Sequence, residues 1–231
     1  MVDRSNGTGA KAKSTVDKGG ADSATRQQLL DAALVLFAQY GVEAVSIRQI
    51  TKAAGQANQS AVHYHFSDRD GLVMAVIDHV CEMLAPLQVL ASAELSAIAQ
   101  ARTPTVKEVV TLGFQPLVQF HMASSSGRVA LRFLSRLLWQ SGTQAFDRMV
   151  LRLWPYFHQQ IEPYLEAALP HKPRAAVAVQ SMIAVSTVIH MLADTRLLTN
   201  ETLLGLDQTI QKDPGLVAEY FLDFLVGGLS A

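Results

Sequence analysis

The sequence predicts an all-α protein, in which a small domain with three helices, the second and third of them short, precedes a larger helical domain. Apolar residues recur at three- and four-residue spacing from residue 23 onward, and no strand-like alternation is sustained beyond residue 85. Pro and Gly divide the rest of the chain into stretches of helical length. The 231 residues are 49% hydrophobic and 17% charged, so the chain can bury a sizeable core and is not disordered as a whole.

The composition favours a cytoplasmic protein. Cys81 is the single cysteine and cannot close an intrachain disulfide, and the first twenty residues lack the apolar stretch of a signal peptide. The longest apolar stretch, 175–193, is interrupted by polar side chains that a membrane span would have to hide, so we expect no membrane partner. The formal net charge is −1, and any affinity for nucleic acid must therefore come from where the charges lie.

Residues 1–22 are rich in Gly, Ser and Lys without apolar periodicity, and we expect a disordered N-terminal arm there. The first helix is expected to begin near the cap candidates Ser23 and Thr25 and to end at Gly41. One face of this helix carries an apolar stripe made of Leu30, Ala33, Leu34 and Phe37.

Two short helices and a long one complete the first domain, which we place at residues 23–84. Ser46 and Gln49 form the pattern of a capping box for the second helix, which Gly55 ends. Asn58 is a cap candidate for the third helix, which runs to Phe66. A second capping pattern, Ser67 with Asp70, opens a fourth helix that leaves the domain near residue 84.

The second domain, residues 85–231, is predicted to be helical throughout. The expected helices lie near 87–101, 105–124, 127–140, 144–168, 173–198 and 214–229.

Three helices of this kind, with the second and third joined by a tight turn, form a helix-turn-helix unit whose last helix enters the major groove of DNA. The start of the third helix is polar, as that role requires, and helix N-termini bind phosphates. Arg48 could instead pair with Glu43 or Asp31, and His65 is better interpreted as a structural residue. The DNA-binding candidates are Ser46, Arg48, Lys52, Gln56, Asn58, Gln59, Ser60, His63, Tyr64 and Arg69.

The stretches TRQQLLDAALVLFAQYGVEAVSIRQITKAAG and SAVHYHFSDRDGL, within residues 25–72, resemble the DNA-binding domain of the TetR family of transcriptional regulators. The resemblance implies an N-terminal DNA reader and a helical C-terminal domain that binds an effector and dimerises. Two features depart from the family pattern. The turn at 55–58 is one residue longer than usual, and His63 stands where the family typically has a tyrosine that contacts phosphate.

The second domain combines apolar and aromatic residues with isolated polar groups, the mixture expected of a ligand pocket. We expect a small apolar or weakly acidic effector, and no cofactor. Its histidines are far apart in sequence, and we expect no metal site. The effector-binding candidates are Gln119, His121, Arg136, Trp139, Gln140, His158 and His190.

Two C-terminal segments are expected to form a homodimer. Segment 173–198 is apolar on more than one face, and segment 214–229 carries a broad apolar stripe, so both need cover on several sides. A two-fold dimer would present two reading helices to a palindromic operator.

The sequence thus predicts a DNA-binding transcriptional regulator, with repression by a ligand-released homodimer following from the resemblance. A helical lipid-binding or carrier protein with a degenerate helix-turn-helix is the alternative, favoured by the near-neutral charge of the first domain. An enzyme is the third possibility, and the sequence carries no recognised catalytic motif for it.

Overall fold

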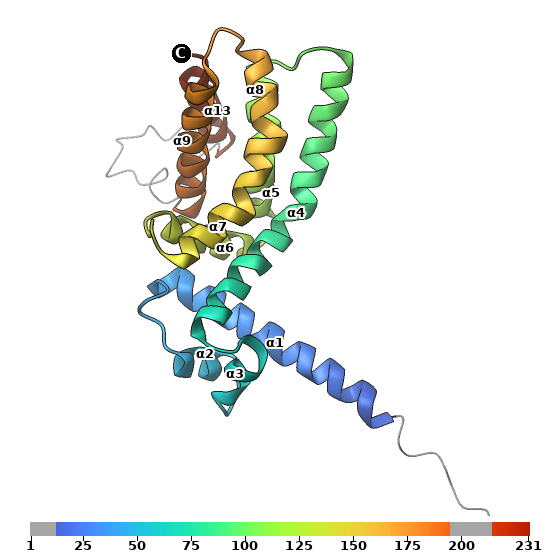
Figure 1. Ribbon diagram of the computed structural model, residues 1–231, viewed down its shortest axis with the longest axis vertical. Helices are drawn as coiled ribbons and strands as arrows, with labels where there is room; N and C mark the ends of the chain where they lie inside the picture. The colour runs from blue at the N-terminus through green and yellow to red at the C-terminus, as the bar shows by residue number, and fades with distance from the viewer. Residues whose placement is uncertain (1–12, 195–213) are drawn as a thin grey trace, which may run out of the picture.

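The computed structural model describes residues 13–194 and 214–231, and in these ranges every regular element is a helix (Figure 1). The elements are α1 (Lys13–Tyr40), α2 (Ile47–Ala53), α3 (Ser60–Phe66), α4 (Arg69–Ala101), α5 (Val106–Ala123), α6 (Ser125–Leu138), α7 (Gln144–Pro155), the π-helical segment η1 (Tyr156–Ile161), α8 (Glu162–Ala168), α9 (Arg174–Ala193) and α13 (Pro214–Ser230).

The helices form a small part and a larger part, which confirms the predicted fold class. In Figure 1, α2 and α3 lie at one end of the molecule, against α1 and the first turns of α4. α4 runs from there along the second part, where α5 to α9 and α13 pack together. α1 also packs against α6, so the two parts share a contact besides α4.

The predicted apolar stripe of the first helix forms the core of the small part. Leu30, Ala33, Leu34 and Phe37 are all buried, together with Ile50 of α2 and Val62 of α3. Burying a side chain of this size contributes roughly 1.5–3 kcal/mol. The Phe37 ring stacks on Phe133 of α6 at 6.1 Å between centroids, which joins the core of the small part to that of the larger part.

α1 begins earlier than the sequence predicts. Its first residue is Lys13, so part of the expected arm is helical, and residues 1–12 lie outside the described residues. The expected cap residue Thr25 lies inside the helix, where its hydroxyl donates to the carbonyl of Ala21 at 3.0 Å. The first helix therefore has no cap at Thr25.

α4 is one continuous helix, whereas the sequence predicted a break between residues 84 and 87. Pro86 lies inside it, and residue 84 is not the end of an element. A proline in a helix interior costs about 3 kcal/mol. Leu84, Ala91 and Leu95 are buried on both sides of Pro86, and their burial outweighs this cost.

The expected helix at 144–168 is instead three consecutive segments, α7, η1 and α8. Pro155 and Pro163 both lack an amide N–H, so the regular hydrogen-bond ladder of an α-helix cannot run through this stretch. The intervening residues adopt the wider π-helical geometry.

α4 and α9 are each long and apolar enough to cross a membrane by length and composition alone. The core helices of soluble proteins meet the same criterion, and both helices here contact several others.

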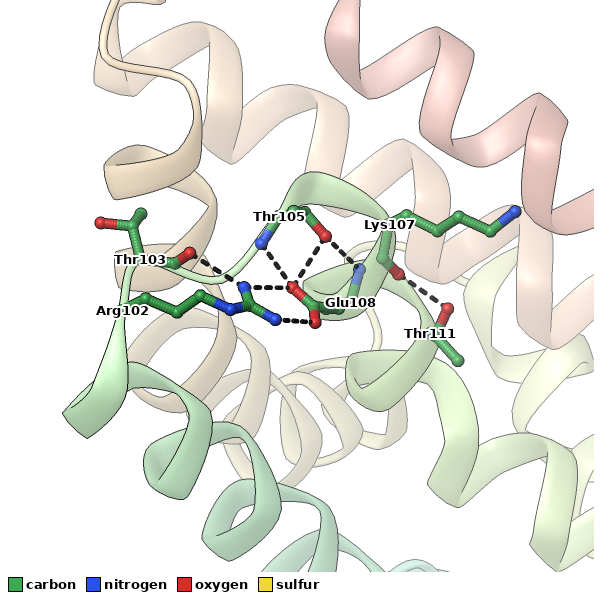
Figure 2. Close-up of polar contacts among 6 residues, drawn as sticks. All are labelled: Arg102, Thr103, Thr105, Lys107, Glu108 and Thr111. Carbon is green, nitrogen blue, oxygen red and sulfur yellow. Dashed lines mark hydrogen bonds and ion pairs between the residues drawn. The ribbon is translucent and has the colours of Figure 1, made fainter.

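The turn between α4 and α5 is fixed by polar contacts around Glu108 (Figure 2). Thr105 and Glu108 form a capping box, in which the Thr105 N–H donates to Glu108 Oε2 at 2.8 Å. The guanidinium of Arg102, the first residue after α4, donates to both carboxylate oxygens of Glu108. Arg102, and after it the backbone N–H and hydroxyl of Thr105, lower the pKa of Glu108 to about 2.

We predict that Glu108 stays ionised in acid because of Arg102. Because its pKa is lowered in the folded protein, the stabilisation by the ionised carboxylate is present above a pH of about 4.5 and is lost as the pH falls toward about 2. In Arg102→Gln, the carboxyl carbon of Glu108 should titrate nearer the ordinary value when followed by NMR. Arg132→Gln, which changes an exposed arginine of α6, is the control; equal midpoints in both variants would contradict the prediction.

Candidate nucleic-acid interface

The N-terminus of α2 is capped as the sequence predicts. Ser46 is extended, and its hydroxyl accepts the N–H of Gln49 at 3.3 Å while the Gln49 side chain accepts the Ser46 N–H at 2.9 Å. Ile50 and Thr51 are buried and hold α2 against the core. An open hollow on the surface beside this helix end is lined by Glu43, Ala44, Val45, Ser46, Ile47, Arg48, Gln59 and Arg69.

The turn between α2 and α3 is tied to α1. Gly55 has φ +68°, a left-handed conformation that favours glycine. The Gln56 side-chain amide donates to Gln28 of α1 at 3.0 Å, so one of its polar groups holds the turn. The side-chain oxygen of Asn58 accepts the N–H of Ser60 at 2.9 Å, but the N-cap position of α3 is Gln59, one residue later than the sequence predicts, and its side chain makes no capping hydrogen bond. Gln59 is exposed beside it.

α3 has the buried face and the exposed face that the sequence predicts. Val62 and Phe66 are buried, whereas Ser60, His63 and Tyr64 are exposed, Tyr64 by 75%. The His63 Nδ1 lies 2.9 Å from the carbonyl oxygen of Ser67, so Nδ1 carries the proton of this hydrogen bond and Nε2 is left for another partner.

α4 begins differently from the prediction. Its cap is Asp68, whose carboxylate accepts the N–H of Gly71 at 2.7 Å, while Ser67 ends α3 with φ +69°. The predicted capping role of Ser67 is therefore wrong. In this tight turn a side chain at Gly71 would meet the carbonyl of Phe66.

Arg69 is turned toward the protein. Its guanidinium donates to the carbonyl oxygens of Val42 and Val45, in the turn that leads into α2. The Val42 carbonyl also accepts the N–H of Val45 at 3.4 Å within the turn. Arg69 adds a charged donor to both carbonyls and so braces the entry of α2 against α4. The sequence did not indicate this contact, because the residues joined are more than twenty positions apart.

The remaining cations at this surface are Arg48 and Lys52, both exposed and without an ion-pair partner in the described part of the chain. The alternative pairing of Arg48 with Glu43 or Asp31 is not among its contacts. His65 lies 3.7 Å from Asp22 of α1, in keeping with the structural role expected for it. Arg26 of α1 lies over the Phe66 ring at 5.3 Å.

The predicted effector residues lie at several places. Gln119 is exposed on α5, and Gln140 lines a hollow between the two parts of the molecule, together with Val42, Glu43, Arg69, Asp70, Val73, Met74, Thr143, Gln144 and Ala145. Arg136 of α6 donates to the carbonyls of Ala38 and Gln39 at 2.8 and 2.9 Å. It therefore holds the C-terminal end of α1, where unpaired carbonyls favour a cation.

Three other candidates lie where α5, α6 and α9 end. Trp139 is 80% exposed and meets the His190 ring edge-on at 5.3 Å. His190 Nδ1 donates to the carbonyl of Ser186 at 2.7 Å. The pKa of His121 is lowered, first by burial and then by the positive charge of Arg128. A hydrogen bond to the backbone of Leu192 partly offsets this shift.

His158 contacts a residue that the sequence analysis did not single out. Its Nδ1 lies 2.7 Å from Oε2 of Glu162, a buried residue with an exposed fraction of 3%. Their four-residue spacing was a visible signal, but an exposed His–Glu pair on a helix surface has the same spacing.

Comparison with known proteins gives one family for the N-terminal part. Residues 29–76 match the family described as bacterial regulatory proteins, tetR family. The transcriptional regulator AcrR of Shigella flexneri is 48% identical over 48 residues, 21% of this chain and 22% of that protein. The nicotine-responsive repressor HdnoR of Paenarthrobacter nicotinovorans is 37% identical over 89 residues, 37% of this chain and 42% of that protein. The matches thus span less than half of the relatives' length.

Solved structures share the fold over most of the chain. NalD of Pseudomonas aeruginosa, a repressor of the MexAB-OprM multidrug efflux pump, has a TM-score of 0.55 at 20% identity over 90% of this chain and 97% of that one. A TetR-family regulator from Rhodococcus sp. has a TM-score of 0.54 at 14% identity over the same shares.

We predict that Arg69 acts on stability and Arg48 does not. Arg69→Gln should lower the free energy of unfolding by about 1–3 kcal/mol, because the carbonyls of Val42 and Val45 lose a charged donor. Arg48→Gln, the control, should change it by less than about 0.5 kcal/mol, because the Arg48 side chain is exposed. Urea denaturation followed by circular dichroism measures both. If the two variants lose equal stability, Arg69 does not brace α2.

Proposed function

We propose that this chain, which carries the DNA-binding domain of the tetR family of bacterial regulatory proteins, is a cytoplasmic transcriptional repressor. It binds a palindromic operator as a homodimer, and a small effector releases it. The observation that carries the proposal is the surface of α3, where buried Val62 and Phe66 leave Ser60, His63 and Tyr64 exposed at the end of the molecule.

In this proposal α3 lies in the major groove of the operator. Gln59 and Ser60 lie at its first turn, where side chains of a reading helix reach base edges. Tyr64 and the free nitrogen of His63 are suited to phosphate or base contacts. Arg48, Lys52 and the N-terminus of α2 with Ser46 supply the phosphate contacts. Gln56, Asn58 and Arg69 hold the turns in place through the contacts described above, and we assign them positioning roles.

The homodimer is proposed to form through α9 and α13. Val179, Met182 and Ile183 of α9 are each more than half exposed, as are Tyr220 and Phe224 of α13. α9 and α13 contact each other, so these side chains belong to neighbouring helices. Apolar patches of this kind on soluble proteins mark interfaces, and a second copy of the chain provides the matching surface.

Release by an effector requires that the second domain act on the first. Typical coupling free energies between two sites are about 1–3 kcal/mol. Two connections are available, namely α4, which runs through both parts, and Arg136, which ties α6 to the end of α1. The effector must bind more tightly to the form in which the two α3 helices do not fit the operator.

Selection of bound sequences from random duplex DNA by the purified full chain tests this function. We expect an inverted repeat, because a two-fold dimer presents two equivalent α3 helices. An unenriched pool at low salt would favour the lipid-binding or carrier alternative, which the near-neutral first domain supports.

The salt dependence of binding to the selected duplex is the control on the mode of contact. Arg48→Gln should lower the slope of log K against log salt by about 1, because one phosphate contact is lost. Arg69→Gln should leave the slope unchanged, because its guanidinium is turned toward Val42 and Val45.

We predict that a charge on α9 separates the dimer. Ile183→Glu should raise the dimer dissociation constant at least about tenfold, because an unpaired carboxylate would be buried at the interface. Leu151→Glu changes a residue of α7 that is 71% exposed outside this surface, and it should leave the dimer intact. Sedimentation velocity distinguishes the two states. Identical sedimentation of both variants and the unaltered chain would place the interface elsewhere.

A further inference from the structure

Glu162 is a buried carboxylate with one oxygen atom unused. Its side chain lies inside the larger part of the molecule, and Oε2 receives a hydrogen bond from His158. Oε1 is buried and has no hydrogen-bond partner among the described residues. Burying a charged oxygen without a partner costs free energy that a core residue would not require. The residue is therefore suited to a partner from outside the chain.

The backbone around Glu162 is irregular. Glu162 follows the π-helical segment η1, and its N–H donates to the carbonyl of Phe157, five residues earlier. Short π-helical segments inside α-helices occur frequently at functional sites, because they redirect side chains.

An aromatic cluster precedes Glu162 along the same segment. Phe157 packs against Phe114 of α5 at 5.6 Å, against Trp154 at 6.5 Å and against Tyr156 at 4.9 Å between ring centroids. The faces of aromatic rings attract cations, and their carbon atoms accept apolar groups. Glu162 follows Phe157 by five residues and is joined to it by the backbone hydrogen bond described above. A carboxylate that follows such a cluster on the same segment supplies the two elements that recognise an ammonium group on an apolar body.

Two more buried oxygen atoms lack a partner in the described part of the chain. They are Oε1 of Gln115 on α5 and Oγ of Ser181 on α9, and both helices contact α8. Together with Glu162 Oε1, the interior formed by these helices offers hydrogen-bond acceptors. The Gln115 and Glu162 oxygens can only accept from a donor that a ligand brings, whereas the Ser181 hydroxyl can accept or donate.

We propose that Glu162 anchors the effector and that the effector is an amphipathic organic cation, a protonated amine attached to an apolar or aromatic body. The assignment rests on the proposed function, since it identifies the ligand of the same regulator. It replaces the weakly acidic effector expected from composition, because an anion would be repelled by the Glu162 carboxylate. The ammonium group is assigned to the unused Oε1, while His158, which is 57% exposed, occupies Oε2.

The test measures the affinity of the full chain for three probes of similar length, phenylbutylamine, phenylbutanol and phenylbutanoate, by isothermal titration calorimetry at a pH of about 7. The amine should bind at least about tenfold more tightly than either of the other two, because only the amine brings a positive charge that can form an ion pair with the Glu162 carboxylate. Equal or tighter binding of the carboxylate overturns the proposal, as does the absence of binding by all three.

Two variants locate the preference. Glu162→Gln keeps the size of the side chain and removes its charge, so the preference for the amine should disappear. Glu166→Gln is the matched control, because Glu166 lies on the same helix but pairs with Arg174 at the surface, at 2.9 Å. Survival of the amine preference in Glu162→Gln overturns the assignment. If this variant does not fold by circular dichroism, the comparison of the three probes on the unaltered chain decides alone.

The outcome is separate from that of the DNA selection. If the chain selects no DNA sequence but prefers the amine through Glu162, the regulator function fails and the cation site stands. If the chain selects an inverted repeat and shows no amine preference, the regulator function stands and the cation site fails.

Discussion

The orientation of the first domain depends on the contacts between α6 and the C-terminal end of α1. Phe133 stacks on Phe37, and Arg136 donates to the last carbonyls of α1, so an apolar and a charged contact hold the same short stretch. α1 provides the core on which α2 and α3 rest, while α6 packs closely on α9. A rotation of α6 would therefore carry α1 with it, together with α2 and α3, because packed interiors resist local deformation.

Arginines provide the polar contacts of this connection. Arg136 of α6 and Arg69 of α4 donate hydrogen bonds to backbone carbonyls at the two ends of the turn between α1 and α2. Farther along α4, Oδ1 of Asp78 lies 3.0 Å from Nε of Arg148 and 3.1 Å from Nε of Arg152, and both arginines belong to α7. Arginine suits these places because its planar fork binds two acceptors in a fixed geometry. The second domain thus holds both helices that position α3, and neither can turn without breaking charged hydrogen bonds.

Local patterns allowed most of the first domain to be predicted. The stripe from Leu30 to Phe37 and the capping box of Ser46 depend on neighbours three or four residues away, so the sequence displays them directly. The roles of Arg69 and Arg136 depend on carbonyls far along the chain, and they could not be read from spacing. The continuity of α4 through Pro86 depends on packing that offsets a local penalty. Such tertiary compensation leaves no periodic signal in the sequence.

The chemical class of the ligand could not be predicted from composition either, because it depends on a single buried atom and not on the average polarity of the domain. The apolar content of the second domain suits many ligands, whereas the unused oxygen of Glu162 distinguishes a cation from an anion. Its position also matters for coupling. Glu162 belongs to the continuous run α7–η1–α8, and the arginines of α7 hold Asp78 of α4. A ligand that pairs with Glu162 therefore contacts the run that holds α4, the helix from which Arg69 braces the entry of α2.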